Sequence, residues 1–338
     1  MANIRDVAKR AGVSTATVSK VLNNKPDVSE ATRAKVMQAV RELNYTSNIH
    51  ARRLFSKKNK TIGVVFFSRV SYVVYTKMFE GINRRTIEQG FDVLTFDEDY
   101  LLSRSGAFSM EEKVDGLIIL GRGFSQDKIE AIKSLSIPYV LCPESVADLP
   151  ATVVSPDNHS IARIAVNYLI AKGHTRIGFV GSSKRYWFSS TRFDGYLSSL
   201  AAHNLPIDSQ VIVDGFEPFY EGGYEAGKQI LEVAKVLPTA LFAVNDFMAM
   251  GVAKYLKEHN IRVPEDISIV GCDDIALAEY FEPPLTTVKI PWEQVGILAT
   301  DTLMKIIKKE PVSQSLLLFN GQLVERKSVV DISGKRGD

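Results

Sequence analysis

The chain has few cysteines and no long apolar run, and both absences narrow its class. Cys142 and Cys272 each stand in a strand-like apolar segment, which predicts buried thiols in a reducing compartment instead of a disulfide framework. The longest apolar runs, such as "VDGLIILG" and "TIGVVFF", are far shorter than the roughly 20 residues that a membrane span needs. The N-terminus, "MANIRDVAKRAG", carries charges where a signal peptide has its apolar stretch. We therefore expect a cytoplasmic protein with no membrane partner.

The sequence also lacks the motifs that common catalytic and cofactor sites require. The segment "GRGFSQ" lacks the third glycine of a dinucleotide fingerprint, and neither a phosphate-loop motif nor a G-x-S-x-G elbow is present. The five histidines form no metal-ligand spacing with one another or with the cysteines. We expect a protein that is not an enzyme, with no catalytic residue, no metal site and no cofactor.

Charge of both signs is present, but it is divided unevenly along the 338 residues. Residues 1–60 hold 13 Lys and Arg against 4 Asp and Glu, whereas the remainder is weakly acidic. The length predicts two or three compact units. A basic head on an acidic body is the distribution expected of a nucleic-acid-binding segment joined to another domain. The alternative is a solvated basic surface without a partner.

Capping residues predict three short helices in the head. Asn3 can cap a helix that Gly12 ends in a left-handed conformation, and Ser14 and Ser29 can cap a second and a third helix. Helices of this length are not stable alone, so their apolar faces must pack together. The tight "AGVS" connection favours a helix-turn-helix arrangement of the first two.

In the second predicted helix, apolar and small polar residues fall on opposite faces. Val18, Val21 and Leu22 recur at helical spacing and face the small core. The opposite face holds Thr15, Ala16, Ser19, Lys20 and Asn23. Small side chains with one long cation let a helix approach base-pair edges, which suits the DNA major groove. The alternative is a solvated helix face.

The stretches "IRDVAKRAGVSTATVSKVLNN" and "VSEATRAKVMQAVRELNY" closely resemble the DNA-binding signature of the LacI/GalR family of bacterial transcription regulators, and the resemblance continues along essentially the whole chain. It implies that bases are read by Thr15, Ala16 and Lys20. It implies that phosphates are held by Thr17, Ser19 and Asn23. Ala16 stands where some family members have a larger polar residue, and it can touch a thymine methyl group but cannot donate a hydrogen bond.

Residues 47–61, "SNIHARRLFSKKNKT", join the head to the body. The segment has helix-compatible residues, with Leu54 exposed among nearby cations. It resembles the family's hinge helix, which implies that Leu54 wedges into a base step in the minor groove and kinks the duplex. Ala51 would allow close approach, and Arg52 would lie near phosphates. Ser47 stands where the family often has proline, and the alternative is a disordered basic tether.

After residue 61, short apolar strands alternate with amphipathic helices. This repetition predicts an α/β fold with parallel sheets covered on both faces, here in two lobes. The late segment "PPLTTVKIPWEQVGILATDTLMKII" indicates a return crossing, which agrees with the periplasmic-binding-protein-like core that the resemblance implies. The predicted domains are a helix-turn-helix head (1–46), a hinge (47–60) and a core (61–338). Within the core, lobe one takes about 61–160 and 290–320, and lobe two about 161–289 and 321–332.

Residues that follow strands are the candidates for a binding cleft, because ligands of open parallel sheets bind beyond the carboxyl ends of the strands. The predicted effector-binding residues are Ser68, Tyr72, Tyr75, Trp187, Arg192, Asn245 and Asp273, with Phe188 as a further aromatic candidate. Hydrogen-bonding groups beside flat apolar surfaces suit a sugar. The resemblance places Arg192, Asn245 and Asp273 at the family's effector positions. For Asp246 and Asp274, helix capping is the alternative role, and Asp157 is predicted to cap the helix after "VSPDN".

Together these features predict a sequence-specific regulator of transcription, specifically a repressor of carbohydrate-utilisation genes. Its expected partners are double-stranded operator DNA, a small sugar-like effector in the cleft between the lobes, and a second copy in a homodimer. Two alternatives stay open. The first is a catabolite-control type of regulator governed by a protein corepressor. The second is a sugar-binding transport protein, which the body alone would permit.

Overall fold

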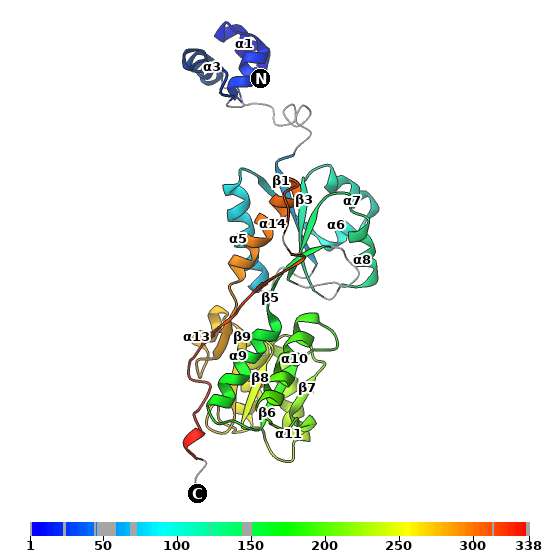
Figure 1. The fold of residues 1–338 in the computed structure, drawn as a ribbon, viewed down its shortest axis with the longest axis vertical. Helices are drawn as coiled ribbons and strands as arrows, with labels where there is room; N and C mark the ends of the chain where they lie inside the picture. Colours follow the sequence, from blue (N-terminus) through cyan, green and yellow to red (C-terminus); the bar gives the residue numbers. More distant parts are fainter. Residues whose placement is uncertain are drawn as a thin grey trace. The chain divides into compact units, whose positions relative to one another are not determined.

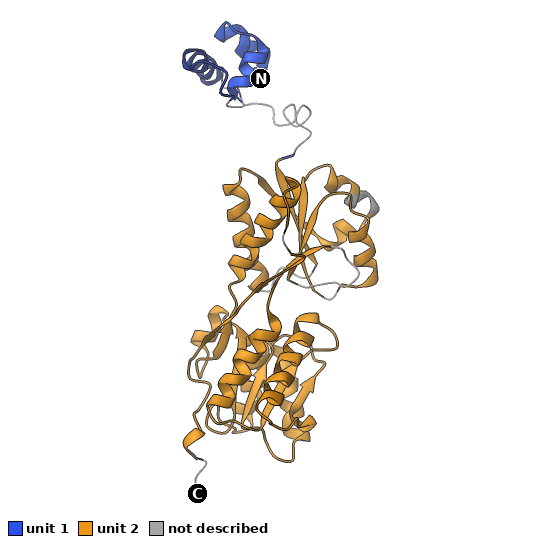
Figure 2. Ribbon diagram, in the orientation of Figure 1, with its two compact units in different colours: residues 1–59 blue, residues 60–338 orange. Residues whose placement is uncertain are grey.

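The computed structural model forms two compact units, residues 1–59 and residues 60–338 (Figure 2). The described residues are 2–22, 25–43, 45, 59–67, 73–122, 124–143, 151–312 and 314–335, apart from the side chains of 104–107. Some predicted site residues lie outside these ranges, namely Asn23, Ala51, Arg52, Leu54, Ser68 and Tyr72.

The first unit is a three-helix head. Its helices are α1 (Ile4–Ala11), α2 (Thr15–Leu22) and α3 (Glu30–Glu42). The small apolar core between them holds Val7, Ala8, Val18, Val21, Val36 and Ala39. No single helix offers enough apolar surface to fold alone, so the head depends on this shared core.

The predicted helix caps of the head are present. The side chains of Asn3, Ser14 and Ser29 each accept a hydrogen bond from a backbone N–H two or three residues later. Gly12 ends α1 at φ 66°, a left-handed conformation that glycine adopts without strain. Local side-chain chemistry therefore sets where these helices begin and turn.

The second unit has two lobes, each built around a six-stranded sheet (Figure 1). In lobe one all the strands are parallel, in the order β11-β5-β4-β3-β1-β2. These strands are β1 (Thr61–Phe67), β2 (Asp92–Asp97), β3 (Gly116–Gly121), β4 (Tyr139–Pro143), β5 (Thr152–Pro156) and β11 (Leu316–Phe319). Its helices are α5 (Val73–Glu88), α6 (Glu98–Leu102), α7 (Arg104–Glu111), α8 (Gln126–Lys133) and α14 (Trp292–Ile307).

Lobe two repeats the plan in the order β12-β10-β9-β8-β6-β7, with β12 antiparallel to β10. Its strands are β6 (Ile177–Gly181), β7 (Ile212–Asp214), β8 (Ala240–Ala243), β9 (Ser268–Asp273), β10 (Thr286–Lys289) and β12 (Gln322–Val324). Its α-helices are α9 (Asn158–Ala171), α10 (Trp187–Ala202), α11 (Tyr220–Val233), α12 (Asp246–Glu258) and α13 (Ala276–Tyr280). Two short 3-10 helices, η1 (Ser209–Val211) and η2 (Ser333–Lys335), complete the described part.

Five interior strands of the two sheets are buried along their whole length. Every residue of β1, β3, β6, β8 and β9 is buried. Helices on both faces remove such strands from water, which is why their sequences are apolar runs without alternation. The predicted α/β class with parallel sheets is confirmed.

The chain passes between the lobes three times. The crossings run from β5 to α9, from β10 to α14 and from β11 to β12. Asp157 lies in the first crossing and caps α9 by accepting from Ser160 N, as predicted. Each lobe therefore includes a piece from the C-terminal part of the chain.

Two glycines hold α14 closely against α5 in lobe one, where the two helices lie side by side (Figure 1). A Cβ atom at Gly81 would meet the carbonyl of Glu293, and one at Gly296 would meet the carbonyl of Met78. Only glycine permits this approach. The contact fixes the position of Trp292, the first residue of α14.

His174 joins the C-terminal tail to lobe two. Its buried ring places Nδ1 3.0 Å from Thr239 Oγ1 and Nε2 3.1 Å from the carbonyl oxygen of Val330. A carbonyl only accepts, so Nε2 donates there. Burial lowers the pKa of His174 below 6.5, although Val330 and Asp331 oppose this shift. The folded chain therefore favours the neutral ring.

We expect stability to fall in acid because of His174. The unfolded chain takes up a proton near pH 6.5, and the folded chain resists this, so the stabilisation is full above pH 6.5 and lost as the pH falls below it. The loss is at most about 1.4 kcal/mol per pH unit. His174→Gln should show a shallower decline in urea unfolding at pH 7.5, 6.5 and 5.5. Parallel declines in the two proteins would contradict the assignment.

Candidate functional site

The face of α2 turned away from the head core carries the polar residues that the sequence singled out. Among the described residues of this face, Thr15, Ala16 and Lys20 are exposed. Thr17 and Ser19 are half-buried. Because Val18 and Val21 are buried on the opposite side, the helix is anchored with a low, polar surface directed outward. Such a surface can reach base edges in a major groove.

Lys20 already has an acidic partner within the head. Its Nζ lies 2.6 Å from Asp27 Oδ2, and more than half of each side chain is exposed. The hydrogen bond from Lys20 lowers the pKa of Asp27. A contact between Lys20 and nucleic acid must replace this ion pair.

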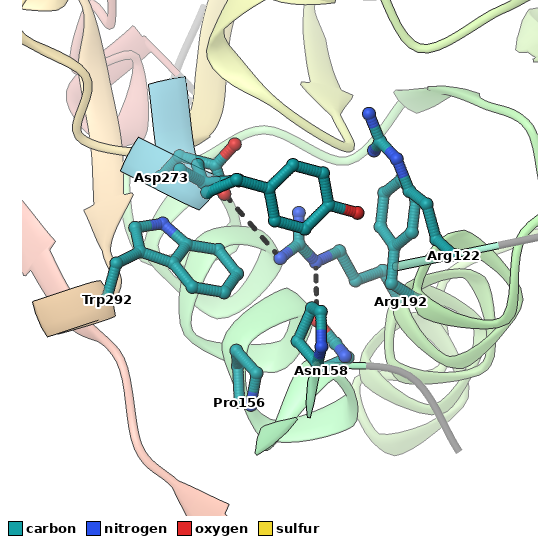
Figure 3. A pocket seen from close by; sticks show the side chains of 10 residues that line it. Arg122, Pro156, Asn158, Arg192, Asp273 and Trp292 are labelled. Atoms are coloured by element: carbon teal, nitrogen blue, oxygen red, sulfur yellow. Dashed lines mark hydrogen bonds and ion pairs between the residues drawn. The ribbon is translucent and has the colours of Figure 1, made fainter. Parts of the chain in front are cut away.

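A pocket lies between the two lobes of the second unit (Figure 3). Its cavity volume is about 30 Å³. Its lining residues come from both lobes: Val74, Tyr75, Arg122, Pro143, Pro156, Asn158, Phe188, Arg192, Asp273 and Trp292. A wider groove of about 390 Å³ adjoins it and shares Val74, Asp273 and Trp292. Polar groups thus converge on a space with aromatic walls.

Arg192 stands at the centre of the pocket, between Asp273 and Asn158 (Figure 3). It lies on α10, is 2% exposed and donates from Nε to Asn158 Oδ1 at 2.9 Å. Its other nitrogens contact the carbonyl of Val244 and, at 3.7 Å, Asp273 Oδ1. Its guanidinium also lies over the ring of Phe188, 5.2 Å from the centroid. These contacts fix the guanidinium plane for bonding to a ligand.

Asp273 ends β9, at the edge where a parallel sheet presents its ligand-binding residues. Its backbone has φ 117°, in the region that side chains other than glycine rarely adopt. Burial raises the pKa of Asp273 to about 6, against the opposing effect of Arg192 and Arg122. A strained, buried carboxyl beside a guanidinium is typical of a binding site.

Arg122 and Trp292 are pocket residues that the sequence reasoning missed. Arg122 directly follows β3, so the rule that ligands bind beyond the carboxyl ends of parallel strands applies to it as well. Trp292 lies 8% exposed at the start of α14. Within the described part of the chain, its buried indole N–H has no hydrogen-bond partner, which makes it a donor for a ligand.

The structure brings Tyr75, Arg192 and Asp273 together in the pocket and places Trp187 and Asn245 outside its lining. Phe188, the residue after Trp187 in the sequence, lines the pocket instead. Asn245 is fully buried and caps α12, where its Oδ1 accepts from Met248 N and its Nδ2 donates to the Pro218 carbonyl.

The two aspartates that were open to a capping role make other contacts. Asp246 is buried and accepts from Ile275 N and Thr287 Oγ1. Asp274 forms an ion pair with Arg326 at 2.7 Å. Asp246 therefore links α12 to β10 and to the segment after β9. Asp274, which directly follows β9, links that segment to Arg326 after β12.

Comparison with known proteins identifies the chain. Residues 3–48 match the profile of bacterial regulatory proteins of the lacI family, and residues 166–329 match a periplasmic binding protein-like domain. The probable HTH-type transcriptional repressor ExuR of Bacillus subtilis (strain 168) is 32% identical over 97% of this chain and 98% of its own length. The ribose operon repressor of Escherichia coli (strain K12) is 34% identical over 97% and 100%. The chain belongs to the lacI family.

Two solved structures of similar proteins share the fold over 97% of this chain. The lac repressor dimer bound to operator and the anti-inducer ONPF superposes with a TM-score of 0.83, at 27% identity over 97% of this chain and 99% of that one. The complex of the transcriptional regulator CelR with cellobiose has a TM-score of 0.72, at 27% identity over 97% and 100%. The predicted family and the two-lobed, periplasmic-binding-protein-like core are confirmed.

As a lacI-family member the chain is a DNA-binding regulator of transcription and not an enzyme. The lacI match at the head excludes the sugar-transport alternative. Among the described residues, no helix combines the length and apolar character needed to cross a membrane.

Proposed function

We propose that this lacI-family regulator is a cytoplasmic repressor of carbohydrate-utilisation genes, and that a small sugar-like effector in the pocket between the lobes controls its binding to operator DNA. The proposal rests on the buried Arg192–Asp273 pair at a pocket with aromatic walls, in a chain with a lacI-family head. Two similar proteins support it: one is the ribose operon repressor, and the other, CelR, is solved in complex with cellobiose.

In the head, we assign base reading and phosphate contacts to the outward face of α2. The proposed base-reading residues are Thr15, Ala16 and Lys20. The proposed phosphate contacts are Thr17, Ser19 and Asn23. Minor-groove contact is assigned to Ala51, Arg52 and Leu54 of the hinge. Thr15, Ala16 and Lys20 are exposed, as base reading requires, and Thr17 and Ser19 are half-buried.

In the core, we assign the sugar to the pocket between Arg192 and Trp292. Arg192 and Asp273 bond its hydroxyls, and Tyr75, Phe188 and Trp292 provide flat apolar surfaces. Ser68 and Tyr72 remain in the proposed set, whereas Trp187 and Asn245 lie outside the pocket lining.

The small volume of the pocket couples its occupation to the arrangement of the lobes. A cavity of about 30 Å³ is smaller than a sugar, so we propose that the lining moves apart, toward the adjoining groove of about 390 Å³, when a sugar binds. A ligand that binds one arrangement more tightly than another shifts the population toward it. Lobe movement is then the link between effector and head.

We also propose that the chain binds DNA as a homodimer. The short helix α13 presents Leu277, 57% exposed, and Tyr280, 81% exposed, one turn apart. Large apolar side chains at such exposure are typical of an interface. Two heads would double the contacts that one short helix can make and would favour a pseudo-palindromic site.

Selection of binding sites from random DNA tests the proposed function. We expect the full chain to enrich a pseudo-palindromic sequence and to sediment on it as a dimer. Sugars added to that complex should change operator affinity at least about fivefold, since coupling energies are typically 1–3 kcal/mol. A response only to a partner protein from the same cell would support the corepressor alternative. A monomer on the selected site would overturn the dimer.

A further inference from the structure

The turn at the end of β9 has two consecutive aspartates in left-handed backbone conformations. Asp273 has φ 117° and Asp274 has φ 55°. Residues other than glycine rarely adopt such angles, and they keep them only where the surrounding structure enforces them. The turn matters for the pocket, because the buried Asp273 lines it with Oδ1 3.7 Å from Arg192 Nη2 (Figure 3).

Arg326 contacts the second aspartate of the turn. Its Nη2 lies 2.7 Å from Asp274 Oδ1, and the two side chains are only 16% and 13% exposed. Water therefore screens this pair less than it screens an ion pair on the surface. Lys289 approaches the other carboxylate oxygen to 3.9 Å, but its side chain is mostly exposed. Arg326 is thus the closer and better buried cation of the two.

Arg326 is itself held in place by the strand next to β9. Its backbone N–H donates to Thr286 Oγ1 at 2.9 Å, and its Nη1 donates to the Leu285 carbonyl at 2.9 Å. Thr286 begins β10, which pairs with β9. A planar guanidinium can bond a carbonyl and a carboxylate at the same time. Arg326 therefore holds the Asp274 carboxylate at a fixed position beside the sheet.

Asp246 anchors the residue that follows the two aspartates. Its Oδ2 accepts from Ile275 N at 2.9 Å, and its Oδ1 accepts from Thr287 Oγ1. Arg326 and Asp246 thus hold the chain at two successive positions, and Asp273 lies just before them. Without Arg326 one anchor remains, and the Asp274 carboxylate is free to turn toward water.

We infer that Arg326 is a positioning residue of the effector site, which holds Asp274 in its left-handed conformation and so directs the Asp273 carboxylate into the pocket beside Arg192. This inference rests on the proposed assignment of that pocket to the effector. Arg326 lies outside the pocket lining, so it acts through the backbone of the turn and does not touch the effector. A carboxylate that is oriented in advance loses less rotamer freedom when it binds a ligand.

Crystal structures of the full chain and its variants test the inference without any ligand. In Arg326→Met we expect residues 273 and 274 to leave the left-handed region, and the Asp273 carboxylate to separate from Arg192 beyond the roughly 4 Å of an ion pair. In the double variant Arg326→Met with Asp274→Gly the carboxylate should return, because glycine adopts a left-handed conformation without a side chain to hold it. A role of Arg326 in packing alone would not be rescued in this way.

Calorimetry with cellobiose and with ribose as probes measures the consequence for binding. A probe that binds the wild type should bind Arg326→Met about 10- to 150-fold more weakly, the loss of a charge-assisted hydrogen bond. It should bind the double variant within about threefold of the wild type. Arg262→Met is the matched control, because Arg262 pairs with Asp266 at the same 2.7 Å on the surface of lobe two. The affinity of Arg262→Met should also stay within about threefold.

Arg326→Lys takes the place of Arg326→Met if the latter does not fold. Lysine keeps the charge but lacks the planar fork that spans Asp274 and the Leu285 carbonyl, so we expect the same displacement of the turn. An unchanged turn would overturn the inference, and so would a displaced turn that Asp274→Gly does not restore. If the Asp273 carboxylate moves and returns as expected while no sugar changes operator affinity, the positioning role stands and only the proposed effector fails.

Discussion

Replacing Arg192 by methionine is expected to destabilise the core unit by about 3 to 5 kcal/mol and to abolish the response to effector. Arg192 is 2% exposed and faces the buried Asp273, so its loss leaves a carboxylate in the interior without its cation. It also removes the donors that bond Asn158 and the Val244 carbonyl. Urea unfolding measures the first effect, and calorimetry with the effector measures the second.

Two further variants test whether Arg192→Met is destabilised by an unpaired buried charge. Arg262→Met removes another arginine of lobe two, but that side chain is 67% exposed and paired with Asp266 on the surface. The free energy of unfolding of Arg262→Met should stay within about 0.5 kcal/mol of that of the wild type. The double variant Arg192→Met with Asp273→Asn should recover part of the loss, because the unpaired charge is gone. Wild-type stability in Arg192→Met would contradict a buried ion pair.

Operator affinity should distinguish whether the Arg192 variant fails at the cleft or at the head. None of its contacts lies in residues 1–59, so at temperatures where the core is folded we expect operator binding near that of wild type. Effector should no longer change it. A loss of operator binding in a folded variant would mean that the pocket sets the DNA-binding state even without ligand.

Lys20→Ala is expected to weaken binding to the selected operator by at least about 10-fold, and to weaken binding to random DNA much less. A well-placed base contact contributes about 1 to 3 kcal/mol of discrimination, and a homodimer loses it twice. Non-specific binding depends on the sum of phosphate contacts, of which one lysine is a small part. Fluorescence anisotropy on operator and random duplexes at several salt concentrations measures both.

Asp27→Asn serves as the control with the opposite sign. Asp27 holds Lys20 at 2.6 Å in the head, and a neutral amide no longer competes with DNA for the lysine. Operator binding should become tighter, with a smaller change on random DNA. If Lys20→Ala weakens operator and random DNA equally, Lys20 contacts phosphate and does not read bases.

Features set by neighbouring residues were predictable from the sequence. Asn3, Ser14 and Ser29 cap helices because their side chains reach backbone N–H groups two or three residues away. The interior strands β1, β3, β6 and β8 are almost wholly apolar because helices cover both of their faces. These signals need no knowledge of distant parts of the chain.

Features set by residues far apart in the chain were only partly predictable. Arg192 and Asp273 were predicted as ligand residues, but their burial depends on Asn158 and Val244 arriving from other elements. Trp292 enters the pocket because glycines bring α14 against α5, and that contact joins segments more than 200 residues apart. Asn245 follows a strand like the pocket residues, yet its amide is engaged within its own lobe by Pro218 and Met248.

Because the chain crosses between the lobes three times, recombination can exchange the head more simply than it can exchange a single lobe. The head is connected to the core by a single stretch of chain, so one junction near residues 47–60 exchanges it as a unit. Exchange of either lobe needs three junctions, between β5 and α9, β10 and α14, and β11 and β12. One exchange at the head junction therefore gives a new combination of operator and effector specificity, whereas a new combination of lobes needs three exchanges.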